Sequence, residues 1–164
     1  MSSIDQLLEN NKRYAESFDK GDLQLAPSKG VAIVACMDAR LDVYRICGIE
    51  EGDAHVIRNA GGVVTHDEIR SLALSQRLLG TTEIMLIHHT DCGMLTFTDD
   101  EFKREIQNEI GQKPNWAAEA FPDVEDDVRQ SLQRVRNSPF VTKTSSLRGF
   151  VFDVATGKLN EVTD

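Results

Sequence analysis

Short, mostly apolar runs alternate along this chain with longer amphipathic segments. The clearest run, residues 31–35, is β-branched and follows a loop of Pro, Ser, Lys and Gly. Such a run is typical of a strand buried on both faces of a parallel sheet. The same kind of pattern predicts strands at 54–57, 83–88 and 147–153, the last followed by a Thr-Gly turn.

The segments between these runs show helical spacing and helix-start signals. Residues 4 to about 18 carry one apolar stripe, made of Ile4, Leu7, Leu8 and Tyr14, as expected of an amphipathic helix. Capping boxes at Thr65–Glu68 and Thr98–Glu101 each predict a helix start. The predicted helices run from these boxes to Gly80 and to about Gly111, and a further helix spans about 124–137 before Pro139.

Strands that alternate with helices indicate an α/β fold. We expect one domain over residues 1–164, with a mostly parallel central sheet flanked by helices. In such sheets functional groups gather beyond the carboxyl ends of the strands. Cys36 follows the first predicted strand and His89 follows the third, so both fall at this edge.

The composition of the chain limits the kinds of partner that it is expected to bind. The 164 residues carry a formal net charge of −9, with 40% hydrophobic and 27% charged residues. Acidity argues against nucleic acid and anionic membrane surfaces. The N-terminal sequence lacks the pattern of a secretory signal and no apolar run approaches the ~20 residues of a membrane span, so a cytoplasmic protein is expected. Of the three cysteines, Cys47 is expected to be a free thiol rather than part of a disulfide framework.

Two groups of residues suggest metal chemistry. Cys36, Asp38 and Arg40 share one side of the strand exit if the chain stays extended there, and His89 with Cys92 can present two donors to one metal. Two thiolates and one imidazole are three zinc ligands, which leaves a fourth position open. Each group alone also fits a plainer interpretation, namely buried cysteines, a satisfied histidine and a surface ion pair. His88 is a rival ligand because the register of the strand end is unknown.

The ordered motifs bring these groups together. Cys-x-Asp-x-Arg at 36–40, Arg-Asn-Ala-Gly at 58–61 and His-x-x-Cys-Gly at 89–93 resemble the β-class carbonic anhydrases, in particular their short, compact branch. This branch includes members that hydrolyse carbonyl sulfide or carbon disulfide. The resemblance covers the chain from about residue 4 onward. It departs at Ala39, where many members have Ser, and at Met37, and these two positions bear on substrate preference.

The resemblance implies a specific site. It places one zinc ion per chain on Cys36, His89 and Cys92, which selects His89 over His88. It makes Asp38 and Arg40 the catalytic pair beside the metal and places Gly61 in the loop near the substrate. It also implies a homodimer or homotetramer, with the N-terminal helix within residues 1–20 at a subunit contact. The apolar stripe of Ile4, Leu7 and Leu8 is compatible with that contact and equally with packing on its own subunit.

The expected reaction follows from zinc chemistry. Zinc lowers the pKa of its bound water from 15.7 toward ~7, which supplies hydroxide near neutral pH. Asp38 either orients this hydroxide or occupies the fourth position itself, and both arrangements compete for Arg40. The expected function is hydration of carbon dioxide to bicarbonate. Hydrolysis of carbonyl sulfide or carbon disulfide is the alternative on the same site, and a non-catalytic zinc-binding module is the alternative of another class.

Overall fold

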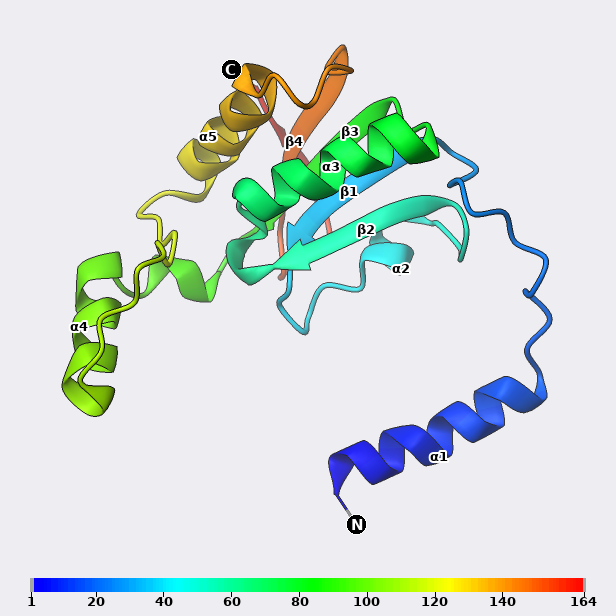
Figure 1. Ribbon diagram of the computed structural model, residues 1–164, viewed down its shortest axis with the longest axis horizontal. Coiled ribbons are helices and arrows are strands. Elements are labelled where there is room, and N and C mark those ends of the chain that lie inside the picture. Colours follow the sequence, from blue (N-terminus) through cyan, green and yellow to red (C-terminus); the bar gives the residue numbers. More distant parts are fainter. Residues whose placement is uncertain (1, 164) are drawn as a thin grey trace.

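One five-stranded sheet organises the molecule (Figure 1), in the order β2-β1-β3-β4-β5. The computed structural model describes residues 2–163, so the outermost ends of the expected 1–164 domain, Met1 and Asp164, lie outside the described residues. The strands are β1 Val31–Cys36, β2 Ala54–Asn59, β3 Glu83–His89, β4 Ser146–Phe152 and β5 Leu159–Val162. The α-helices are α1 Ser3–Glu16, α2 Val43–Cys47, α3 His66–Leu79, α4 Asp99–Ile110 and α5 Val124–Asn137, with short 3-10 turns η1 Ala60–Gly62 and η2 Gly93–Leu95.

The first four strands pair in parallel, and only β5 runs antiparallel, at the edge beside β4. The predicted α/β fold with a mostly parallel sheet is therefore confirmed. In the register of β1, Cys36 pairs with Asn59 and Ala35 pairs with Ile87. This register brings the ends of β1, β2 and β3 to the same edge of the sheet.

Alternating residues of the strands feed two separate cores. Ala32 and Val34 of β1 join the core that α3 and α5 cover, whereas Ile33 and Ala35 join the core on the other face. This alternation is the period-two geometry of a strand. The second core lies beside α2 and includes both Cys36 and Cys92, so the expected site is continuous with a packed interior.

Helix ends follow their sequence signals. Both predicted capping boxes are present, at Thr65–Glu68 and Thr98–Glu101. Gly80 caps the C-terminal end of α3 and Gly111 that of α4, each in the left-handed conformation that glycine adopts without a steric penalty. Three acidic residues in the first turn of α5 interact favourably with the positive end of the helix dipole.

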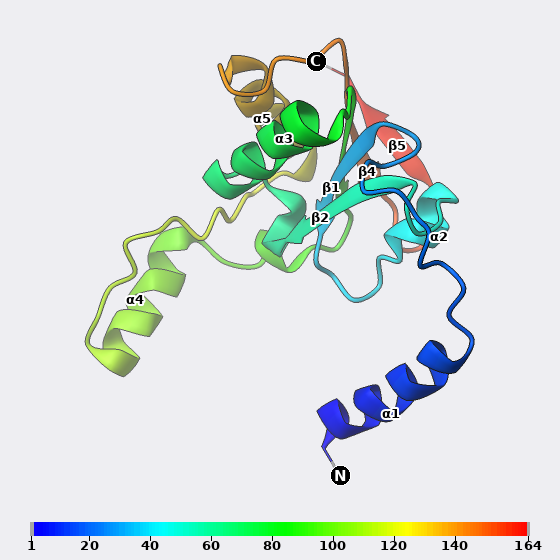
Figure 2. The ribbon, with the colours of Figure 1, turned by 45° about the vertical axis from the view of Figure 1, so that its right-hand side comes forward.

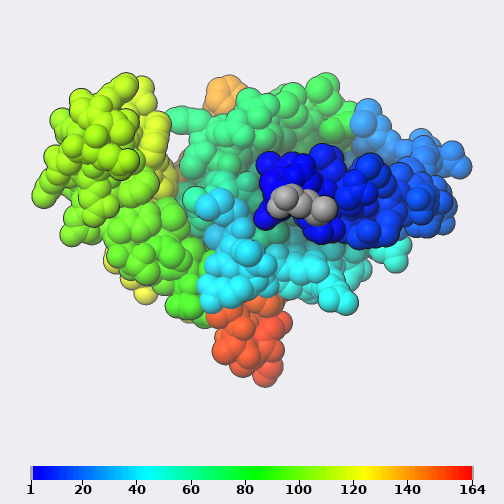
Figure 3. All heavy atoms as spheres, turned by 90° about the horizontal axis from the view of Figure 1, so that it is seen from below, coloured from blue at the N-terminus to red at the C-terminus, as the bar shows by residue number. Residues whose placement is uncertain are grey.

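Two helices project from the sheet (Figures 1 and 2), namely α1 and α4. Neither contains a buried residue. In Figure 3 the dark-blue atoms of α1 form a ridge in front of the body, and α4 forms a separate lobe on the left. No helix within residues 2–163 is long and apolar enough to cross a membrane.

Candidate metal centre

Three predicted donor residues meet at the edge where β1 and β3 end. Cys36 is the last residue of β1, His89 is the last of β3, and Cys92 directly precedes η2. Their donor atoms all lie within 4.8 Å of one another, and the three residues are buried. Parallel pairing of neighbouring strands brings together residues that are fifty-three positions apart in the chain.

The two adjacent histidines point to opposite faces of the sheet. His89 Nε2 lies 3.2 Å from the Cys36 sulfur, whereas His88 Nε2 lies 2.7 Å from Asp127 Oδ2 of α5. Successive strand residues must diverge in this way. His88 Nδ1 is buried without a hydrogen-bond partner among the described residues. His89, and not His88, therefore faces the two thiols.

A backbone contact fixes the ring state of His89. Its Nδ1 lies 2.7 Å from the carbonyl oxygen of Thr90. A carbonyl can only accept, so Nδ1 is the donor and Nε2 is directed at the Cys36 sulfur. This is the outer hydrogen bond that orients metal-bound histidines in general.

The thiols of Cys36 and Cys92 interact, and their pKa values shift in opposite directions. A hydrogen bond from the Cys92 thiol lowers the pKa of Cys36, and the backbone N–H groups of Asp38 and Gly61 add to this effect. The same contact, together with burial, raises the pKa of Cys92. Burial disfavours a charged His89, but its contacts with Cys36 and the Thr90 carbonyl outweigh burial and raise its pKa. A metal would replace these protons.

The chemistry of this donor set fits zinc. Two sulfurs and one imidazole nitrogen are ligands that Zn²⁺ prefers. Three protein ligands leave one coordination position for a small molecule, as in catalytic rather than structural zinc sites. The residues present therefore suit a reactive metal ion.

Asp38 and Arg40 form a charged pair beside these donors. Arg40 Nε donates to Asp38 Oδ1 at 3.0 Å, and Arg40 Nη2 donates to Asp38 Oδ2 at 2.9 Å. These bonds hold the pKa of Asp38 far below its ordinary value. Asp38 Oδ2 also lies 3.6 Å from His89 Nε2. The carboxylate is thus ionised and adjacent to the donor atoms.

The chain does not remain extended past Cys36. A turn closes between the Leu41 N–H and the Asp38 carbonyl at 3.0 Å, and the Arg40 N–H donates to Asp38 Oδ1 at 2.8 Å. The pair forms because this turn brings Arg40 back onto Asp38. The extended chain on which the sequence argument for Cys36, Asp38 and Arg40 was conditional is therefore not present, although the side chains of Asp38 and Arg40 do meet.

Arg58 of β2 stabilises the strand exit, a role that the sequence did not reveal. Its guanidinium donates to the carbonyl oxygens of Cys36 at 2.9 Å and Asp38 at 2.8 Å. The Met37 N–H in turn donates to the Asn59 carbonyl at 2.7 Å. The segment that carries Cys36 and Asp38 is therefore held against β2 by both backbone and side-chain bonds.

The glycine pair in η1 lets this loop approach the donor residues. Gly62 has φ +71°, and a Cβ atom there would lie 2.9 Å from the Cys36 nitrogen and from the Ile87 oxygen. Gly61 has φ +86°, and its Cβ would lie 3.0 Å from Met94 Cγ. Only residues without a side chain fit here, because the conformation and the close contacts both exclude one.

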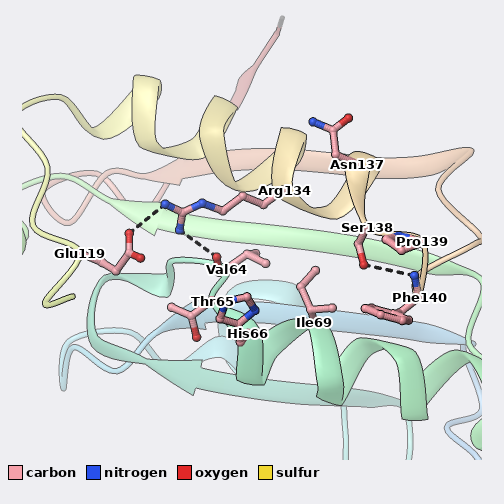
Figure 4. Close-up of a pocket in the computed structure, with 10 residues that line it drawn as sticks. All are labelled: Val64, Thr65, His66, Ile69, Glu119, Arg134, Asn137, Ser138, Pro139 and Phe140. Carbon is pink, nitrogen blue, oxygen red and sulfur yellow. Dashed lines mark hydrogen bonds and ion pairs between the residues drawn. The ribbon is translucent and has the colours of Figure 1, made fainter. Parts of the chain in front are cut away.

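A separate pocket of about 480 Å³ lies between the start of α3 and the end of α5 (Figure 4). Arg134 borders it and donates to the Val64 carbonyl and to Glu119, each at 3.0 Å. The residues that line this pocket include none of the candidate metal donors and neither Asp38 nor Arg40. Cys47 lies elsewhere, as the free, half-buried thiol that the sequence predicts.

Comparison with known proteins identifies the family. Residues 31–159 match the family model described as carbonic anhydrase. The chain is 70% identical over 163 residues to β-carbonic anhydrase 1 of Mycobacterium tuberculosis, covering 99% of both sequences. The chain belongs to the β-carbonic anhydrase family. A solved carbonic anhydrase from Streptococcus mutans is 41% identical, with a TM-score of 0.93 and 99% of both chains covered.

More distant relatives of this chain include proteins named for another activity. A carbon disulfide hydrolase from an Acidianus strain is 31% identical over 182 residues, covering 96% of this chain and 88% of that protein. The resemblance inferred from the three motifs is thus confirmed, including the presence of such hydrolases among the relatives.

Proposed function

We propose that this β-carbonic anhydrase family member is a zinc enzyme that hydrates carbon dioxide to bicarbonate and a proton. The observation that carries the proposal is the buried Cys36–His89–Cys92 cluster with the Asp38–Arg40 pair directly beside it. Cys36, His89 and Cys92 would hold one zinc ion. When bound, zinc supplies Lewis-acid activation of a water molecule.

The charged pair orients the reacting water. Asp38 is ionised and accepts a hydrogen bond from that water, which directs a water lone pair at the carbon of carbon dioxide. Arg40 fixes the plane of the Asp38 carboxylate through two side-chain bonds. If Asp38 instead moved onto the fourth ligand position, water would be excluded, so the Arg40 contact favours the active arrangement.

The loop containing Gly61 forms the wall near the substrate. Support comes from its backbone N–H, which faces the Cys36 sulfur, and from its burial against Met94. A small linear substrate needs little space at this position. Carbonyl sulfide and carbon disulfide have the same shape, and relatives near 31% identity are carbon disulfide hydrolases, so they are the alternative substrates.

We further infer a homodimer or homotetramer in the cytoplasm. The stripe on α1 exposes Ile4, Leu7 and Leu8 by 68%, 65% and 57%, which favours association with a partner chain. A reducing compartment suits the centre because Cys36 and Cys92 lie close enough to be vulnerable to oxidation.

The proposal is tested by measuring initial rates with carbon dioxide, carbonyl sulfide and carbon disulfide, together with zinc content. We expect about one zinc per chain and the highest rate with carbon dioxide. Asp38→Ala should keep zinc and lose roughly 10- to 100-fold in turnover, as outer contacts of metal sites typically do. Asp100→Ala, an exposed change on α4, is the matched control. A parent rate in Asp38→Ala would contradict the assigned role.

A further inference from the structure

Arg40 contacts a second carboxylate in addition to Asp38. Its Nη1 donates to Asp91 Oδ2 at 2.8 Å, and its Nη2 donates to the Asp91 carbonyl oxygen at 2.9 Å. The guanidinium is thus bound on one side by Asp38 and on the other by both the side chain and the backbone of Asp91. A planar guanidinium held from two sides has little freedom to rotate.

The backbone of Asp91 is shaped for this contact. Its φ is +55°, a left-handed conformation that few residues other than glycine adopt, although aspartate tolerates it. Asp91 lies between His89 and Cys92 in the chain. The loop that joins two donor residues therefore also holds the arginine that orients Asp38.

The contact is too exposed to serve mainly for stability. The side chains of Asp91 and Arg40 are 80% and 47% exposed, and ion pairs of this kind contribute little to folding. Their geometry is nevertheless specific, since two separate oxygens of one residue accept from the same guanidinium. Such a contact is better suited to fixing direction than to adding stability.

We propose that Asp91 is a positioning residue for the hydration reaction, acting through Arg40. It keeps the guanidinium in the plane that pairs with Asp38, and so keeps Asp38 directed at the reacting water. Without the Asp91 carboxylate, Arg40 can follow Asp38 when Asp38 turns toward the fourth ligand position. The proposal rests on the proposed function and adds a residue to its machinery.

Two substitutions separate the side chain of Asp91 from its backbone. Asp91→Asn keeps the size and the tolerance for a left-handed backbone but removes the charge. Asp91→Gly keeps the backbone conformation and its carbonyl contact but removes the side chain. In both variants we expect full zinc content, kcat about 5- to 10-fold lower and an unchanged KM for carbon dioxide. The matched control is Asp67→Asn, which breaks an exposed 2.8 Å pair with Arg70 on α3 and should leave kcat unchanged.

Combining these variants with Arg40→Ala shows whether Asp91 acts through Arg40. In the Arg40→Ala background, removing the Asp91 carboxylate should not lower kcat any further. Equal losses in both backgrounds, a parent kcat in both single variants, or loss of zinc would each overturn the proposal.

A second readout does not depend on activity. In zinc-loaded protein, the Arg40 Nε–H resonance, assigned by its absence in Arg40→Ala, should exchange with water faster in Asp91→Asn and Asp91→Gly than in the parent. Unchanged exchange would overturn the positioning role. A parent chain inactive toward carbon dioxide would overturn the proposed function instead, so the two failures are distinguishable.

Discussion

The donor centre and the two projecting helices are built on opposite principles. At the centre, Cys36, His89 and Cys92 are at most 4% exposed and are fixed by strand pairing and backbone hydrogen bonds. On α1, large apolar side chains such as Leu7 are about two-thirds exposed. One chain therefore supplies the donor atoms of its centre, whereas it leaves apolar helix faces that it does not bury itself.

This contrast separates what one chain determines from what assembly determines. Burying an apolar side chain such as leucine stabilises the buried state by roughly 1.5–3 kcal/mol. Burial of the exposed stripe on α1 against a partner would therefore favour association. The three donor residues of the centre, by contrast, are already buried within one chain. Substitutions at the centre should affect chemistry within each chain, and substitutions on α1 should affect assembly.

The largest effect is expected at the centre itself. Cys92→Ser removes one of three donors, so zinc should be lost and turnover should fall by more than about 100-fold. Elemental analysis and initial rates measure both. Cys47→Ser is the control, because burial raises the pKa of this half-buried thiol and it lies outside the cluster. Full zinc retention in Cys92→Ser would refute the ligand assignment.

The second-largest effect is expected in η1, the glycine-containing loop that packs against the strand ends carrying the donor residues. Gly62→Ala places a Cβ 2.9 Å from backbone atoms of two strands, which cannot move aside. We expect a loss of about 3 kcal/mol or more in the free energy of unfolding, measured by urea denaturation.

Gly80→Ala measures how much of the loss in the free energy of unfolding comes from the left-handed backbone alone, without close contacts. Gly80 has a similar φ of +76°, but nothing lies within 4 Å of an added Cβ. This variant should lose only about 1–2 kcal/mol. Equal losses in the two glycine variants would mean that the close approach at Gly62 contributes nothing.

The third effect should appear in assembly rather than in the centre. Leu7→Asp places a charge in the exposed stripe of α1 and should shift the native mass toward the 18.3 kDa of one chain, as measured by analytical ultracentrifugation. Zinc content should stay unchanged. Asn10→Asp adds the same charge on an exposed position of the same helix and should leave the mass unchanged. A stable oligomer in Leu7→Asp would exclude this stripe as the contact.

The sequence predicted those parts of the fold that carry strong local signals. β1 is an unbroken apolar run and β3 contains one at residues 84–87, and α3 and α4 begin with capping boxes that the structure reproduces. It missed α2, which has five residues and is too short for periodicity. It also missed β5, four residues of mixed polarity whose pairing depends on β4. The subunit contact expected within 1–20 stays a prediction.

At the centre, residue types were predictable but their connections were not. The Cys, His and Cys donors followed from their motifs and from the rule that parallel strand ends meet at one edge. The turn that brings Arg40 onto Asp38, and the left-handed backbone at Asp91, have no signal in hydrophobic periodicity. Contacts across fifty-one positions, as between Arg40 and Asp91, arise only when the sheet is assembled.

The smallest effect is expected for the folding stability that the Asp38–Arg40 pair contributes. Its size shows whether this pair is held as firmly as the donor residues or as loosely as an exposed surface pair. Arg40 holds the pKa of Asp38 below its ordinary value of 3.8, so Asp38 binds fewer protons in the folded chain than in the unfolded chain around that pH. The pair therefore stabilises the fold fully above that value, and the stabilisation is lost as pH falls through the lowered folded pKa.

Arg40→Ala should accordingly be less stable than the parent from about pH 5 to 8, with a difference that shrinks below about pH 4. Urea denaturation at pH 7, 5, 4 and 3.5 measures this difference. Arg77→Ala is the control, because Arg77 donates to the Phe140 carbonyl, which does not titrate, so its cost should stay constant with pH. A stability difference for Arg40→Ala that widens toward acid would contradict an ionised Asp38. If Arg40→Ala and the parent had the same free energy of unfolding at every pH, the Asp38–Arg40 pair would contribute nothing to folding stability. Its role would then be confined to orienting the reacting water.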